Sequence, residues 1–100
     1  MTVRLFVRRR AKADVRSAAR WYELQRSGLG RDFVAEVDRA LKQVAENPFQ
    51  YQMLHREARR AIVHRFPYGV FYRIEADKII VFCVIHLHRD PASWRARVPK

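Results

Sequence analysis

The sequence of 100 residues contains little cysteine and little glycine. Its single cysteine, Cys83, excludes an internal disulfide and a zinc site built from several thiolates. Its three glycines, Gly28, Gly30 and Gly69, do not form a phosphate-binding glycine loop. No apolar run approaches the roughly 20 residues that a transmembrane helix requires, since the longest extends only over residues 79–85.

Acidic residues are also scarce, and this imbalance is the first indication of function. Lysine and arginine number 21 against 10 aspartates and glutamates, which gives a net charge of +11 at pH 7. Seventeen of the basic residues are arginine, whose planar guanidinium suits phosphates and carboxylates. We therefore expect the partner to be nucleic acid, an acidic protein segment, or a protein that itself handles nucleic acid.

The first half of the chain predicts a strand and two helices. Apolar and polar residues alternate at the start with the period of a strand, and the alternating apolar residues are Val3, Leu5 and Val7. From Ala11 to about Ser27 the apolar spacing changes to three and four, as in an amphipathic helix. A second helix is predicted over about 31–46 and ends at Asn47-Pro48, because proline disfavours helix for the residue before it.

The link between the two predicted helices is very short. Gly28 suits the left-handed conformation that closes a helix, and Leu29 and Gly30 then form the connection. Helices joined by so few residues fold back on each other as an antiparallel hairpin. The shared apolar side of this hairpin needs a sheet to cover.

The second half of the chain predicts that sheet. Strands are predicted over 60–65, 70–75 and 79–88, with a packed loop at 49–55, a turn at 66–69 and a hairpin connection at 76–78. The last strand is apolar on both faces, as in a central strand. The prolines of the segment 89–100 exclude one regular element there. The β-α-α-β-β-β order predicts a single α+β domain over 1–100, a helical hairpin packed on a small, mainly antiparallel sheet.

Three histidines suggest a metal site at first sight. His86 and His88 are two residues apart on a predicted strand and so point the same way, and His64 lies on a strand that could be adjacent. No carboxylate joins them except Asp90, and no second ligand pair supports the geometry. We therefore expect neither a metal nor any other cofactor.

Acid–base chemistry on RNA is an alternative that the residues leave open. Cleavage through the 2′-hydroxyl needs a base, an acid and cations around the phosphate. The residues available for these roles are His86 or His88, Arg65, Arg73, Arg89 and Tyr72. Tyr72 lies on the apolar side of its strand, which favours a place in the core, and Arg73 alternates with buried positions as on a solvated sheet face.

Two further basic segments are candidates for contacts. The triplet Arg8-Arg9-Arg10 follows the first predicted strand, where a solvated loop is favoured over a phosphate grip. This triplet also comes after the apolar stretch, which is the opposite of the order in a signal peptide. Trp94 lies among arginines in the tail and must dock on the core or contact a partner. Docking is favoured, because aromatic side chains usually pack.

Four segments carry a resemblance to a known family. They are WYELQRSGLGRDFVAEVDRAL, NPFQY, RRAIVHRFPYGVFYRI and VIHLHRDPASWRAR. In this order, and over about the whole chain, they resemble the RelE/ParE superfamily of bacterial type II toxin–antitoxin systems. The resemblance implies the β-α-α-β-β-β fold, a toxin, and a small antitoxin that wraps and neutralises it. Operator DNA is then expected to be bound only through the antitoxin.

The resemblance to the ribonuclease branch, whose RelE-like members cleave mRNA on the ribosome, is incomplete. When the Tyr-x-x-x-Tyr strands are aligned, an arginine of that branch falls on Gly69. One of its lysines falls on Arg60 and a second falls on Ile62. The arginine after the last strand is retained as Arg89, whereas the C-terminal aromatic of that branch falls close to Trp94 or Arg95, where this sequence has no tyrosine.

The GLG..F hinge and the FPY…H..RDP..W..R ending are more similar to the ParE branch. That branch shares the fold, lacks a nuclease constellation and inhibits DNA gyrase. The leading prediction is a ParE-like toxin that acts by binding gyrase, with no catalytic residue. The alternatives are an mRNA interferase, with His86 or His88 as acid or base and Arg65, Arg73 and Arg89 on the phosphate, and a non-toxic basic interaction domain.

Both toxin predictions share one partner, the antitoxin. A cationic sheet face and rim are expected to bind an acidic, amphipathic antitoxin segment by helix-in-groove packing or strand addition. The residues predicted to contact a partner are Arg60, Arg65, Arg73, Arg89, Trp94 and Arg97. We expect a cytoplasmic protein that binds gyrase, or the ribosome and mRNA under the alternative, and no membrane.

Overall fold

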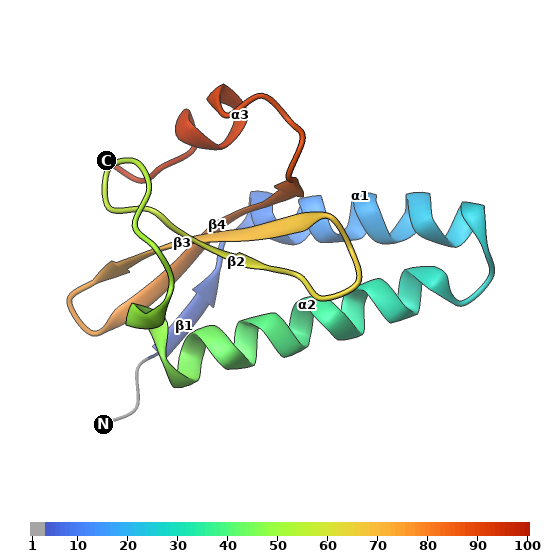
Figure 1. The fold of residues 1–100 in the computed structure, drawn as a ribbon, viewed down its shortest axis with the longest axis horizontal. Coiled ribbons are helices and arrows are strands. Elements are labelled where there is room, and N and C mark those ends of the chain that lie inside the picture. Colours follow the sequence, from blue (N-terminus) through green and yellow to red (C-terminus); the bar gives the residue numbers. More distant parts are fainter. Residues whose placement is uncertain (1–3) are drawn as a thin grey trace.

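A computed structural model describes residues 4–100, which form a four-stranded sheet packed against two long helices (Figure 1). In chain order the elements are β1 (Arg4–Val7), α1 (Arg9–Gln25), α2 (Leu29–Glu46), the 3-10 turn η1 (Pro48–Gln50), β2 (Arg59–Ile62), β3 (Tyr68–Glu75), β4 (Lys78–His86) and α3 (Ala92–Arg95). The predicted β-α-α-β-β-β order and the α+β class are confirmed. Of the first predicted strand, Val3 lies outside the described residues.

The strand order in the sheet is β1-β4-β3-β2. Strand β3 pairs antiparallel with both β2 and β4, whereas β1 lies parallel to β4. The sheet is therefore mainly antiparallel, as predicted. Strand β4 is central and buries side chains on both faces, which explains its continuous apolar sequence.

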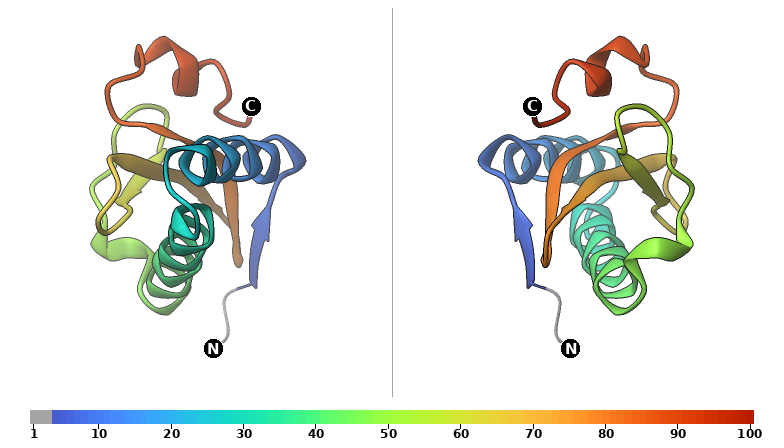
Figure 2. Two further views of the ribbon diagram at one scale, coloured as in Figure 1. Left: turned by 90° about the vertical axis from the view of Figure 1, so that its right-hand side faces the viewer. Right: turned by 90° about the vertical axis from the view of Figure 1, so that its left-hand side faces the viewer.

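The sheet has an apolar layer on each face. The larger layer lies between the sheet and the helices and includes Phe33 of α2, Val70 and Tyr72 of β3, and Val81 of β4. The smaller layer lies on the opposite face, beneath α3 and the C-terminal tail. Figure 2 shows α2 and α3 on opposite sides of the sheet.

The two long helices cross closely at their connection. The Glu23 carboxylate accepts hydrogen bonds from the backbone N–H groups of Gly28, at 2.9 Å, and Gly30, at 3.0 Å. A Cβ at Gly30 would lie 2.5 Å from the carbonyl oxygen of Ala19, so only glycine fits there. Gly28 has a φ of 89°, which confirms its predicted left-handed conformation. The predicted connection at Leu29 and Gly30 is wrong, because both residues belong to the first turn of α2.

Other predicted boundaries also shift. Helix α1 begins two residues before Ala11. Strand β2 ends at Ile62 and not at the predicted Arg65, because Arg65 has a φ of 72°, which lies outside the range of a strand. Strand β4 ends at His86, where the backbone N–H of Arg89 turns back to the His86 carbonyl. The segment 49–55 is packed only in part, since Phe49 is 67% exposed.

None of the helices formed by residues 4–100 combines the length and the apolar character that crossing a bilayer requires.

Candidate partner-binding surface

The sheet face opposite the long helices is apolar and covered. The ring of Trp94 stacks on Phe71, with centroids 4.8 Å apart and an angle of 23° between the planes. Only 7% of Trp94 is exposed, so its predicted docking on the core is confirmed. The buried residues of this layer are Ala58, Phe71, Phe82, Cys83, Ile85, Trp94 and Val98. Burial raises the pKa of the Cys83 thiol to about 11, so the thiol is neutral at pH 7.

Gly69 lies on this covered face and makes room for an arginine side chain. A Cβ at Gly69 would lie 3.0 Å from Cδ and 3.1 Å from Cγ of Arg60. The aliphatic stem of Arg60 therefore crosses β3 at the position where the ribonuclease branch is expected to carry an arginine. Arg60 is half-buried, and its stem adds apolar cover to the sheet.

Two of the predicted contact arginines hold the C-terminal tail in place. Arg73 donates a hydrogen bond to the Pro99 carbonyl, and only 20% of its side chain is exposed. Arg97 lies 2.9 Å from Asp14 of α1 and is 10% exposed. Asp14 also accepts a hydrogen bond of 3.0 Å from the backbone N–H of Val84. The expectation of a solvated Arg73 is wrong, because the tail covers that side chain.

A second region, which we call the rim hollow, lies where β4 ends beside α1. Its lining includes Trp21, Tyr68, His86 and Arg89, and its volume is about 350 Å³. The Tyr68 and His86 rings are 5.4 Å apart, whereas 57% of Trp21 is exposed. Burial raises the pKa of Tyr68, which therefore keeps its proton at pH 7 and can donate it in a hydrogen bond.

His86 at the rim hollow is in contact with His88. Their ring centroids are 5.1 Å apart, and the backbone N–H of His88 donates to Nδ1 of His86 at 3.0 Å. Because Nδ1 accepts this bond, the proton of a neutral His86 ring lies on Nε2. His64 lies elsewhere, 3.7 Å from Glu36 of α2. Within residues 4–100, no three histidine, cysteine, aspartate or glutamate side chains gather as a metal site.

The residues of the predicted ribonuclease set are only partly brought together. His86 and Arg89 line the rim hollow, and the ring of His88 lies beside that of His86. Tyr68 of β3 is the strand partner of His86. Arg73 lies five residues further along β3, at a distance of about 17 Å from Tyr68. Arg65 lies over the Phe66 ring and 3.8 Å from an aspartate of α2. Tyr72 is fully buried in the core, as predicted.

Sequence reasoning missed the exposed apolar residues of α1. Trp21 and Leu24 are 57% and 80% exposed. Both lie outside the apolar stripe by which the helix was predicted, and Ala18 and Tyr22 belong to that stripe. The sequence did contain a signal for this surface, namely large apolar residues outside the buried stripe of the helix. Such residues often mark contact surfaces.

The fold is shared with a solved protein of a toxin–antitoxin system. The structure is similar to the solved "Chromosomal ParDE TA system from P. aeruginosa", with a TM-score of 0.78 over 85% of this chain and 96% of that chain. The sequence identity is 16%, so this likeness concerns the fold alone. Comparison with curated protein sequences gave no match.

The sequence adds the family. Residues 5–91 match the family described as "ParE toxin of type II toxin-antitoxin system, parDE". The chain therefore belongs to the ParE toxin family, and the resemblance noted from its motifs is confirmed. Membership in a type II toxin–antitoxin family implies a cognate antitoxin as partner.

Proposed function

We propose that this ParE toxin inhibits DNA gyrase by binding it, and that its antitoxin neutralises it by covering the binding surface. We also propose that it acts in the cytoplasm as the single domain expected over residues 1–100. The family gives the starting point for the target. The observation that carries the choice of binding over cleavage is the apolar, covered sheet face under Trp94.

Cleavage of RNA on that face would need cations and an open path to a phosphate. The face instead carries Phe71, Phe82 and Ile85 beneath the tail. Arg73 donates a hydrogen bond to the tail, and Arg97 pairs with Asp14. These contacts support a toxin that acts without a catalytic residue.

The rim hollow is the surface that we assign to the partners. Tryptophan, tyrosine and arginine are the residue types that dominate binding energy at interfaces, and Trp21, Tyr68 and Arg89 line this hollow together. Among the other predicted contact residues, Arg60 and Arg65 keep part of their side chains accessible. Arg73, Trp94 and Arg97 contribute by fixing the tail. A net charge of +11 favours fast association with an acidic antitoxin segment.

The test is a gyrase supercoiling assay with purified toxin. Wild-type toxin should block supercoiling, and Trp21→Ala and Arg89→Ala should each weaken the block at least tenfold. Phe49→Ala is the matched control, since this aromatic residue is at least as exposed as Trp21 and lies at the other end of the helical hairpin. Addition of the product of the neighbouring short reading frame should restore supercoiling.

The ribonuclease alternative has a distinct signature. His88→Ala should leave the supercoiling block unchanged, because His88 lies beside His86 and is not among the residues that line the rim hollow. Ribosome-dependent mRNA cutting that His88→Ala abolishes, together with unimpaired supercoiling, would overturn the proposal.

A further inference from the structure

The N-terminal end of α1 concentrates positive charge that nothing within the described chain neutralises. Arg8 is the N-cap residue, its side chain makes no capping hydrogen bond, and the first turn contains no acidic residue. Arg9, Arg10 and Lys12 follow and are exposed. The backbone N–H groups of a first helical turn lack acceptors in the helix and carry a partial positive charge. Cations at this end are unfavourable unless an anion binds there.

A hollow at the same place has the chemistry of an anion site. It has a volume of about 300 Å³, and its lining is Arg8, Arg10, Phe82 and Arg97. The Arg97 side chain is nine-tenths buried, and its Nε has no hydrogen-bond partner among the described residues. Its terminal nitrogens are held by Asp14 and by the Phe82 carbonyl, so the guanidinium is fixed at the wall of the hollow.

The charges around this hollow do not balance. Asp14 pairs with Arg97, and among residues 4–100 neither Arg8 nor Arg10 forms an ion pair. Two arginine charges therefore face the hollow without compensation. A phosphate group, which carries negative charge and accepts several hydrogen bonds, is the ligand that such a set of guanidinium groups recognises.

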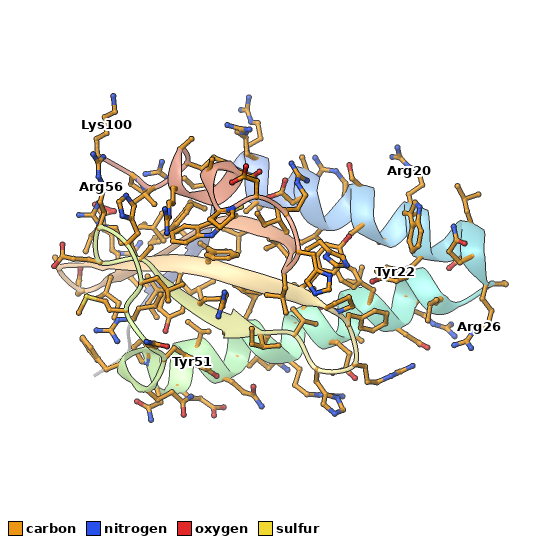
Figure 3. The ribbon with its side chains drawn as sticks, turned by 45° about the horizontal axis from the view of Figure 1, so that its top comes forward. Arg20, Tyr22, Arg26, Tyr51, Arg56 and Lys100 are labelled. Atoms are coloured by element: carbon orange, nitrogen blue, oxygen red, sulfur yellow. The ribbon has the colours of Figure 1, made fainter. Side chains whose placement is uncertain are left out.

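The positive charge continues from the hollow along α1. Lys12, Arg16 and Arg20 are exposed and follow one another at intervals of four residues, so successive members lie about 6 Å apart along one side of the helix. Figure 3 shows the Arg20 side chain extending away from α1. The two acidic residues of α1 do not offset this row, because Asp14 pairs with Arg97 and Glu23 accepts from the start of α2.

We propose that this hollow and the cationic row of α1 bind the phosphodiester backbone of duplex DNA, so that the toxin itself contacts DNA. A rigid helix presents cations at regular spacing, and a duplex presents phosphates at regular spacing. Between Lys12 and Arg20 the row contains no apolar side chain, and the exposed Trp21 and Leu24 of α1 lie beyond Arg20. An acidic peptide would need an apolar anchor along the row itself for stable docking. This activity lies beyond gyrase binding and does not require it.

The test measures binding of antitoxin-free toxin to a fluorescently labelled duplex of arbitrary sequence at several KCl concentrations. Each neutralised phosphate contributes about 0.9 to the slope of log K against log salt for duplex DNA. The double variant Arg8→Gln/Arg10→Gln should therefore reduce the magnitude of this negative slope by about 2. The matched control Lys42→Gln/Arg56→Gln removes the same charge from exposed positions outside α1 and should leave the slope unchanged.

Each alternative outcome is decisive. Equal slopes for the two double variants would mean that only the net charge of the protein matters, and would overturn the proposed site. Competition by polyglutamate as strong as by unlabelled duplex would assign the surface to an acidic peptide instead. If inorganic phosphate stabilises the folded toxin but the duplex does not bind, the hollow is a phosphate site and the proposed DNA binding is wrong. Because no gyrase is present, failure here does not bear on gyrase inhibition.

Discussion

Replacement of Trp94 by alanine tests the covered sheet face. Burial of an aromatic side chain removes about 150–250 Å² from water, which corresponds to about 4–6 kcal/mol at 25 cal/mol per Å². Since only 7% of Trp94 is exposed, nearly all of this area is buried in the folded protein. Measured costs of replacing a buried tryptophan by alanine are about 3–5 kcal/mol. Because the tail can partly close over the gap, we expect the free energy of unfolding to fall by about 3 kcal/mol.

The assay is urea unfolding followed by circular dichroism, since each variant removes one of the two tryptophans. Trp21→Ala is the matched control, and as a change of an exposed side chain it should alter the free energy of unfolding by no more than about 0.5 kcal/mol. The variant at Trp94 should also bind a hydrophobic dye, because it uncovers Phe71. Equal, small effects of the two substitutions would refute the docking of α3 and the argument built on it.

Three further predictions concern the helical hairpin and its junction with the sheet. Hydrogen bonds from the backbone of Gly28 and Gly30 lower the pKa of Glu23 below its ordinary value of 4.5. The stabilisation is therefore present above pH 4.5 and is lost as the pH falls through the lowered pKa. Glu23→Gln should lower the melting temperature at pH 7 and much less at pH 3, and an equal effect at both would contradict the capping role. Gly30→Val should cost several kcal/mol in urea unfolding, since its Cβ meets the backbone of α1. The hydroxyl of Tyr72 donates to the Pro48 carbonyl at 2.5 Å. Tyr72→Phe should therefore cost about 1–3 kcal/mol, and no change in unfolding would mean that water replaces the bond.

Most of the fold follows from local patterns in the sequence. The periods of two and of three to four residues are enough to predict every main strand and helix, because one face of each packs on the core. The start of α2 could not be predicted, because it depends on the Glu23 carboxylate reaching across the connection. The end of β2 depends on the left-handed backbone of Arg65, which has no signal in composition.

The candidate site was less predictable than the fold. Seventeen arginines are equivalent by sequence, and their roles are set by partners far away in the chain. Arg97 meets Asp14, which is 83 residues earlier, and Arg73 meets the carbonyl of Pro99. These pairings turn two expected contact residues into supports for the tail. Trp21 became a candidate only when its exposed position was known.

The most direct measurement follows plasmid topology and transcript 5′ ends in the same culture after toxin expression is induced without antitoxin. Inhibition of gyrase by binding predicts loss of negative supercoiling in the plasmid while the transcripts keep their native 5′ ends. New 5′ ends within translated regions, with plasmid supercoiling unchanged, would contradict the account.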